Sequence, residues 1–208
     1  MTKMTVWEFI KELTNPESII NYGGLALLLF VVFAETGLLV GFFLPGDSLL
    51  FTAGLLCGTE VFHTSIEILL IGLCFAGIIG NMIGYWFGKR IGDKLFVKDD
   101  SLIFKKKYVT ITDNFYKRHG GKTLILGRFL PIIRTFAPIL AGVIKIDFKK
   151  FMLYNVIGCV SWVFSLTLIG YFLGREYPQV KDYLEYIIIG LIVFTTIPVL
   201  STYQKKNS

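Results

Sequence analysis

Three long stretches of the chain lack charged side chains altogether. Residues 68–88, 151–174 and 186–204 contain no Asp, Glu, Lys or Arg. Each matches the ~20 residues that a helix needs to cross the hydrocarbon core of a bilayer. Only 17% of the 208 residues are charged and 54% are hydrophobic, which is more apolar than one soluble domain can hide. The sequence therefore predicts an all-α integral membrane protein.

Cysteine and histidine are too few and too scattered to form a metal or redox site. The three cysteines, Cys57, Cys74 and Cys159, lack metal-ligand or redox spacing, and His63 and His119 stand alone. The sequence also contains no nucleophile–base pair and no nucleotide-binding motif. We therefore expect no cofactor, no metal and no enzyme activity, and a hydrolase or an ATP-driven pump is disfavoured.

The N-terminus does not resemble a signal peptide. Residues 1–18 carry five charges, and no small-residue cleavage site follows the first apolar run at the right distance. Residues 6–13 combine four large apolar side chains, Trp7, Phe9, Ile10 and Leu13, with three charged ones, which predicts a short amphipathic interfacial helix. The net charge of +6 does not indicate nucleic acid, because nearly half of the basic residues lie in one block between spans, where the positive-inside rule explains them.

One sequence pattern occurs twice, at a constant distance of 86 residues. Gly-x-Phe-Leu-Pro begins at Gly41 and again at Gly127, and Gly-Tyr-x-x-Gly followed by a basic residue begins at Gly84 and again at Gly170. Ala53-Gly54 and Ala141-Gly142 match two residues out of phase. The chain is thus interpreted as a duplicated unit of a hairpin and a spanning helix.

The loop charges predict that the two copies have opposite orientations. Residues 89–122 hold ten Lys or Arg and four acids, so this loop and the basic C-terminus should be cytoplasmic. Residues 57–67 have no Lys or Arg and should lie outside. The span 68–88 then runs inward and the span 151–173 outward, which is the inverted-topology repeat of many secondary transporters.

Each copy should contain a hairpin that enters the membrane and returns on the same side. Residues 123–144 begin and end next to cytoplasmic lysines, and Pro131 and Pro138 should break a helix there. Pro45 and Gly46 should break the helix at the tip of the first hairpin in the same way. The predicted organisation is one membrane domain, 1–208, made of an interfacial segment 1–18, repeat 1 at 19–89 with its hairpin at about 35–56, a basic linker 90–122, repeat 2 at 123–175 with its hairpin at 123–144, and a last span 183–203. Residues 19–34 are either a separate span or the first arm of the hairpin.

Four ionisable residues fall inside the apolar hairpins: Glu35, Asp47, Arg128 and Arg134. A charge at the bilayer centre costs about 2.5–3.5 kcal/mol on insertion scales, so acids of one hairpin should pair with arginines of the other. Two guanidinium groups at a helix break also suit a phosphate head group. Glu35 and Asp47 could exchange protons and release the arginines in alternation.

The alternative to this functional hypothesis is a structural role. The buried charges could form salt bridges that only lock the hairpins together.

Asn81 and Tyr85, one helical turn apart, could add polar contacts to the site, although helix packing explains both. Gly72, Ala76, Gly80, Gly84 and Gly88 form a small-residue stripe, which we assign to close helix packing.

The two charged segments resemble the signatures of the DedA family, the bacterial branch of the VTT-domain (SNARE-associated Golgi) superfamily. The resemblance covers roughly residues 20–175. It rests on Glu35-Thr-Gly, on Phe43-Leu-Pro-Gly-Asp47-Ser, and on Gly127-Arg128-Phe-x-Pro131-x-x-Arg134-x-x-x-Pro138-x-x-Ala141-Gly142. The resemblance implies two opposed re-entrant hairpins and a functional need for the four charged residues.

The resemblance also implies lipid translocation in the bacterial cytoplasmic membrane. Family members recycle undecaprenyl phosphate or move phosphatidylethanolamine, and eukaryotic relatives scramble phospholipids. The leading hypothesis is therefore a carrier of polyprenyl phosphate, with membrane lipids as partners and protons or sodium as the coupling ion. A proton-coupled exporter of small cations or drugs, a phospholipid flippase or scramblase, and a purely structural membrane protein are the alternatives.

Overall fold

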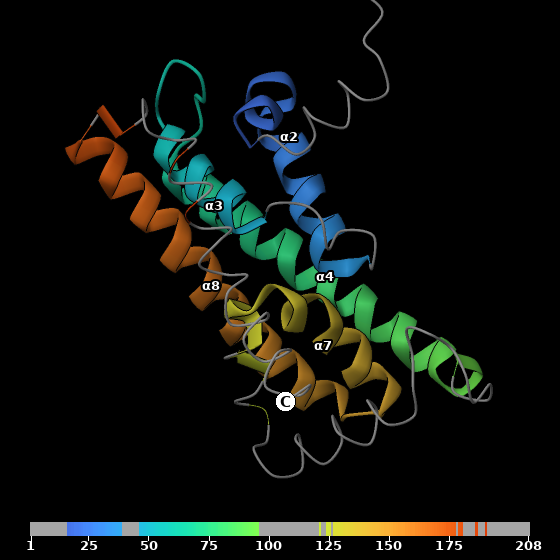
Figure 1. Ribbon diagram of the computed structural model, residues 1–208. Helices are drawn as coiled ribbons and strands as arrows, with labels where there is room; N and C mark the ends of the chain where they lie inside the picture. Colours follow the sequence, from blue (N-terminus) through green and yellow to red (C-terminus); the bar gives the residue numbers. More distant parts are fainter. Residues whose placement is uncertain are drawn as a thin grey trace, which may run out of the picture. The chain divides into compact units, whose positions relative to one another are not determined.

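The described part of the chain is built from helices (Figure 1). The computed structural model describes residues 16–38, 46–95, 121, 124–125, 127–177, 179–180, 186 and 190. Its main elements are α2 (Pro16–Gly37), α3 (Gly46–Leu56), α4 (Ile66–Leu95), the 3-10 turn η2 (Gly127–Phe129), α7 (Pro131–Val143) and α8 (Phe148–Glu176). Within these residues the one β-type contact is an isolated bridge between Cys57 and Phe62. The all-α prediction is confirmed for this part of the chain.

Three helices are long and apolar enough to cross a membrane. They are Ser18–Gly37 within α2, Ile66–Ile91 within α4 and Phe148–Glu176 in α8. The last two contain the predicted spans 68–88 and 151–174. Residues 19–34 belong to α2, although positive φ at Gly24 kinks this helix near its start. The described helices thus fit a membrane protein, as their lack of charge predicted.

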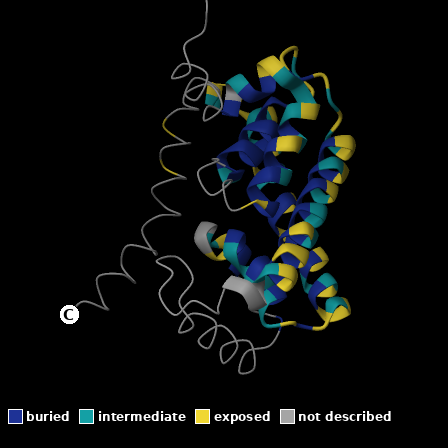
Figure 2. Cartoon of the chain, turned by 90° about the vertical axis from the view of Figure 1, so that its right-hand side faces the viewer, coloured by how far each residue is buried: buried dark blue, intermediate teal, exposed yellow. Residues whose placement is uncertain are grey.

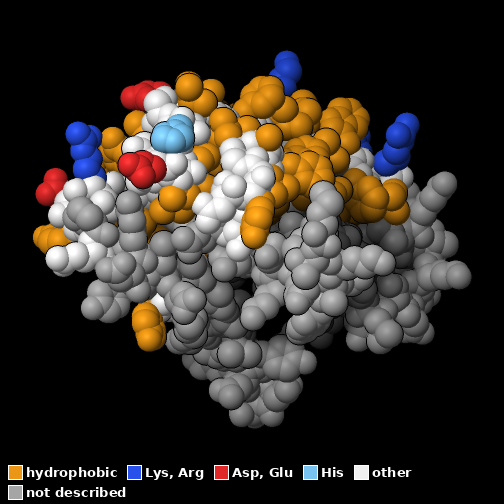
Figure 3. Space-filling view, turned by 90° about the horizontal axis from the view of Figure 1, so that it is seen from above, with side chains coloured by type: hydrophobic (Ala, Val, Ile, Leu, Met, Phe, Trp, Pro, Cys, Tyr) orange, Lys and Arg blue, Asp and Glu red, His pale blue; other side chains and the backbone are white. Residues whose placement is uncertain are grey.

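The surface of the long helices is apolar rather than polar. On α4, Ile71 is 71% exposed and Phe75 67%, and on α8 Leu153 and Phe172 are also largely exposed. Figure 2 shows such exposed residues running along helices whose other faces are buried, and in Figure 3 hydrophobic side chains cover much of the described surface. Apolar patches of this extent are rare on soluble monomers. They suit helices that contact lipid chains.

The chain divides into two compact units. Unit 1 contains residues 1–32, 43–76 and 162–208, and unit 2 contains residues 33–42 and 77–161. The three long helices, α2, α4 and α8, therefore each contribute residues to both units. The first part of α4 belongs to unit 1 and its remainder to unit 2, and α8 begins in unit 2 and ends in unit 1.

In unit 1 the short helix α3 packs directly on the final turns of α8. A methyl group at Gly54 would collide with the Thr167 carbonyl, and one at Gly170 would collide with the Phe51 carbonyl. Ten of the eleven residues of α3 are buried. Backbones can approach this closely only where side chains are absent, so the glycines fix the packing.

In unit 2 the short helix α7 packs on the second half of α4 in the same manner. A methyl group at Gly142 would collide with the Tyr85 carbonyl, and one at Gly88 with the carbonyl of Ile139. Gly80 meets the end of α2 instead, where its neighbours are Thr36 and Phe33. The stripe of small residues on α4 is therefore a packing surface, as its spacing predicted.

Several predicted features lie outside the described residues. They are the interfacial helix at 6–13, most of the basic linker 90–122, the tip residue Pro45 and nearly all of the last span 183–203.

Candidate functional site

A buried ion pair joins the first charged segment to the second within unit 2. Glu35, near the end of α2, accepts a hydrogen bond from Nη2 of Arg134 in α7. Glu35 is 2% exposed and Arg134 3%. Breaking such a pair would leave a charge buried, which costs far more than the pair itself gains. The expected pairing of an acid in one segment with an arginine in the other is confirmed for these two residues.

The beginning of α7 positions the arginine. Pro131 is the first residue of the helix, where its missing N–H has no consequence, and the Arg134 N–H donates to the Leu130 carbonyl at 2.9 Å. Pro138 was expected to break the helix, but α7 continues through it to Val143. A proline inside a helix removes one hydrogen bond, and the packing of α7 on Gly84 and Gly88 offsets that loss.

The second arginine is held by an asparagine of α8. Arg128 lies in the η2 turn, is 4% exposed, and donates from Nη2 to Oδ1 of Asn155. The same oxygen accepts a hydrogen bond from Nδ2 of Asn81 at 2.9 Å, and Nδ2 of Asn155 donates to the Ile78 carbonyl at 3.2 Å. Asn155 therefore connects an arginine of the second segment to helix α4.

Both arginines border one small cavity in unit 2. Asn81 and Asn155 line it as well, and Leu124, Ala137, Pro138 and Phe151 complete the wall. Its volume is about 10 Å³, which is close to the minimum that accommodates one water molecule. The two arginines thus border the same small cavity, but in this conformation a phosphate group does not fit.

Tyr85 takes no part in this cavity. Its hydroxyl donates to the Ile146 carbonyl at 2.6 Å, and its ring stacks on Phe151 with centroids 4.6 Å apart. Both residues belong to a small core that includes Ala141 and Ile146. The structural interpretation of Tyr85 is therefore confirmed, whereas Asn81 joins the network of Arg128.

The remaining predicted acid lies in unit 1. Asp47 is in the first turn of α3, after Gly46, and its Oδ1 accepts a hydrogen bond from Nε1 of Trp162 at 2.8 Å. Trp162 is fully buried, whereas Asp47 is only half-buried. A buried indole needs an acceptor for its N–H, and the carboxylate supplies it.

Unit 1 also contains a polar cleft at the start of α4 and the end of α8. It has a volume of about 450 Å³, and Cys57, Glu67 and Arg175 are among its lining residues. Burial, with a smaller contribution from the Glu67 carboxylate, raises the pKa of the Cys57 thiol to about 11. Its Sγ donates to the Thr64 carbonyl at 3.0 Å. Cys57 is therefore a protonated, unreactive thiol at neutral pH.

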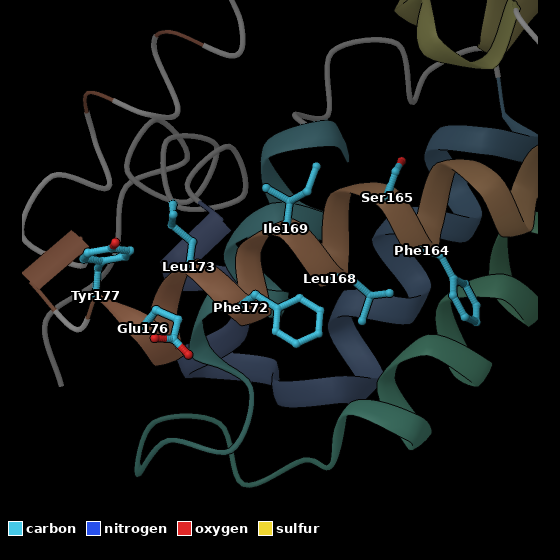
Figure 4. A pocket seen from close by; sticks show the side chains of 8 residues that line it. All are labelled: Phe164, Ser165, Leu168, Ile169, Phe172, Leu173, Glu176 and Tyr177. Carbon is cyan, nitrogen blue, oxygen red and sulfur yellow. The ribbon is translucent and has the colours of Figure 1, made fainter.

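A groove in the described part of unit 1 follows one face of α8 and is apolar (Figure 4). It has a volume of about 640 Å³, and Phe164, Leu168 and Phe172 line it. Its few polar residues, Ser165, Glu176 and Tyr177, do not converge on a point. Such a surface suits lipid chains rather than a charged head group. Among the described residues no group of His, Cys, Asp or Glu could hold a metal ion.

Comparison with known proteins identifies the family of this chain. Residues 44–172 match the model of the VTT domain. Protein DedA of Escherichia coli K12 is 44% identical over 173 residues, which cover 83% of this chain and 78% of that protein. The chain belongs to the DedA family. Inner membrane protein YqjA of the same organism is 34% identical over 204 residues, which cover 95% of this chain and 90% of that protein. No solved structure matches the chain.

Two polar residues of this DedA-family protein escaped the sequence analysis. Asn155 and Trp162 both lie in the uncharged span 151–174, where they looked like ordinary helix residues. A signal was present, because Asn155 is the only Asn or Gln in that span, just as Asn81 is in 68–88. A single amide in an apolar span needs a hydrogen-bond partner. Asn155 binds Arg128 directly and Asn81 binds Asn155, so both amides are connected to a candidate arginine.

Proposed function

We propose that this DedA-family protein is a transporter that carries a lipid with a phosphate head group across the membrane. Polyprenyl phosphate is the first candidate, in a recycling step at the bacterial cytoplasmic membrane. The supporting observation is that Arg128 and Arg134, both buried, border the same cavity. Guanidinium groups bind phosphate oxygens in a planar, bidentate manner, and buried charges in membrane proteins mark substrate pathways.

The proposed architecture has two re-entrant hairpins in an inverted repeat. The short helices support it, because α3 has 11 residues and α7 has 13. At about 1.5 Å per residue, neither reaches across a core about 30 Å thick. Residues 35–56 and 123–144 would enter from opposite sides, with the linker 89–122 and the C-terminus in the cytoplasm. Two relatives are named inner membrane proteins, which supports a location in the cytoplasmic membrane.

Coupling to protons follows from the partner of Arg134. A proton on Glu35 would remove its negative charge and weaken its hold on the guanidinium group. A phosphate oxygen could then replace the carboxylate, so that substrate binding and Glu35 protonation occur together. Asp47 would serve as a second proton site in unit 1. Sodium in place of the proton is the alternative coupling ion.

Binding of the head group requires the cavity to open. A space of about 10 Å³ accommodates no more than one water molecule. Separation of Arg134 from Glu35 is the opening step that the ion pair suggests. The polyprenyl tail would stay in the bilayer, so only the phosphate needs an enclosed path.

The test is leaflet-to-leaflet transfer of labelled polyprenyl phosphate in proteoliposomes, with labelled phosphatidylethanolamine alongside. Wild type should transfer the phosphate lipid selectively, and Arg128→Gln should lose that transfer. Arg175→Gln is the matched control, because Arg175 is an exposed arginine in α8. Normal transfer by Arg128→Gln would exclude the mechanism.

The other outcomes separate the alternatives. Equal transfer of both lipids would indicate a scramblase. Substrate-driven proton movement in vesicles without polyprenyl lipid would indicate an exporter of small cations or drugs. No transfer of either lipid, together with lower stability of the charge variants, would indicate a structural role.

A further inference from the structure

The two buried asparagines have only one possible orientation. A guanidinium group only donates, so the atom of Asn155 that faces Arg128 must be Oδ1. The Ile78 carbonyl only accepts, so the atom of Asn155 that faces it must be Nδ2. The second hydrogen bond to Oδ1 of Asn155 must then come from Nδ2 of Asn81.

This orientation leaves the other amide atom of Asn81 as an acceptor at the cavity. Oδ1 of Asn81 is buried and accepts no hydrogen bond from any residue that the structure describes. Asn81 is 1% exposed and lines the cavity together with Arg128 and Arg134. Buried acceptors without a donor are rare in folded proteins. The cavity therefore combines the donors of two arginines with one acceptor that requires a donor.

We infer that Asn81 determines specificity, by accepting a hydrogen bond from the hydroxyl of a singly protonated phosphate monoester. This inference rests on the proposed function. Such a head group offers oxygen acceptors to the two arginines and one P–OH donor to Oδ1 of Asn81. A phosphodiester has no P–OH, so its phosphate group would leave that oxygen unsatisfied. Asn155 is a positioning residue, since it orients both Arg128 and Asn81.

The protonated form of the ligand is accessible under ordinary conditions. The second pKa of a phosphate monoester is near 6, so about one tenth carries one proton at pH 7 and the share rises as the pH falls. This form also has one charge fewer than the dianion. A smaller charge lowers the desolvation cost of entering a buried site.

Two lipids that differ by one methyl group provide the test: polyprenyl phosphate and its phosphate monomethyl ester. Wild type should transfer the free phosphate about tenfold faster or more, since a buried acceptor left unpaired is costly. In Asn81→Leu the ratio of the two rates should fall towards one. Thr167→Val is the matched control, because Thr167 is the repeat counterpart of Asn81, is also buried, and lies in unit 1. It should keep the wild-type ratio.

The outcomes distinguish this inference from the proposed function. Equal transfer of both lipids by wild type, lost in Arg128→Gln, would overturn the role of Asn81 and retain the phosphate carrier. Transfer of neither lipid would overturn both. If Asn81→Leu does not fold, the ratio in wild type and the conservative variant Asn81→Gln decide. Gln keeps an amide that can donate to Asn155 and accept at the cavity, so it should preserve the preference for the free phosphate.

Discussion

The two units share a packing scheme but differ in their chemistry. In each, a short helix lies against the C-terminal half of a long one through paired glycines, Gly54 and Gly170 in unit 1, Gly142 and Gly88 in unit 2. Unit 1 has a half-buried aspartate bound to an indole N–H. Unit 2 has a buried ion pair and an arginine–asparagine network. The two units thus share a packing scheme, whereas their charged groups differ.

The largest effect should come from breaking the ion pair of unit 2. Arg134→Met leaves Glu35 buried without its guanidinium partner, and we expect a loss of about 3–5 kcal/mol in stability. Thermal unfolding in detergent at neutral pH measures it. The double variant Glu35→Leu/Arg134→Met should recover most of that stability while remaining inactive in transport. A double variant no more stable than Arg134→Met would show that the pair does not account for the loss.

The glycine contacts test whether the scaffold is equivalent in the two units. Gly54→Val and Gly142→Val each force a side chain against a backbone carbonyl, and we expect each to lose about 1–3 kcal/mol or more. Gly58→Val is not a suitable control, because its φ is positive. Gly190→Ala is better, because nothing lies near its added methyl group. A large loss at only one of the two glycines would contradict the shared packing scheme.

The indole contact of unit 1 should matter less than the ion pair. Trp162→Phe removes the hydrogen bond to Asp47 and keeps most of the aromatic packing, so we expect a loss of about 1–2 kcal/mol. Asp47 is half-buried, and water can replace the indole N–H there. Equilibrium unfolding of Trp162→Phe beside Arg134→Met gives the comparison. Equal losses would show that the two sites are energetically alike.

The smallest effect concerns the Cys57 thiol. Because its pKa is raised to about 11, the reactive thiolate is scarce at pH 8 and increases as the pH rises towards 11. Alkylation of Cys57 in a Cys74→Ala/Cys159→Ala background should therefore be at least tenfold slower at pH 8 than that of a free peptide thiol. Fast alkylation at pH 8 would show that the thiol is exposed.

Much of the candidate site was predictable because a charge in an apolar segment is conspicuous. Glu35, Asp47, Arg128 and Arg134 stand out for this reason, and so does the possibility of pairing between segments. The actual partners were not predictable. Asn155 and Trp162 are separated from their partners by 27 and 115 residues, and no local pattern joins them. Pro138 was misjudged, because tertiary packing on α4 retains the helix around it.

The sequence by itself determined the spans 68–88 and 151–174, the repeated sequence pattern and the four unusual charges, because these depend on composition and spacing along one chain. Only the tertiary structure decided which acid pairs with Arg134, and that Asn155 holds Arg128. It also decided the register of the repeats. In unit 1 Gly170 meets the Phe51 carbonyl, and the 86-residue repeat aligns Gly170 with Gly84. In unit 2 the carbonyl that matches Phe51, when Gly54 is aligned with Gly142, is that of Ile139. It meets Gly88, one helical turn beyond Gly84. Register depends on side-chain shape across helices that are distant in sequence, and spacing along the chain does not encode it.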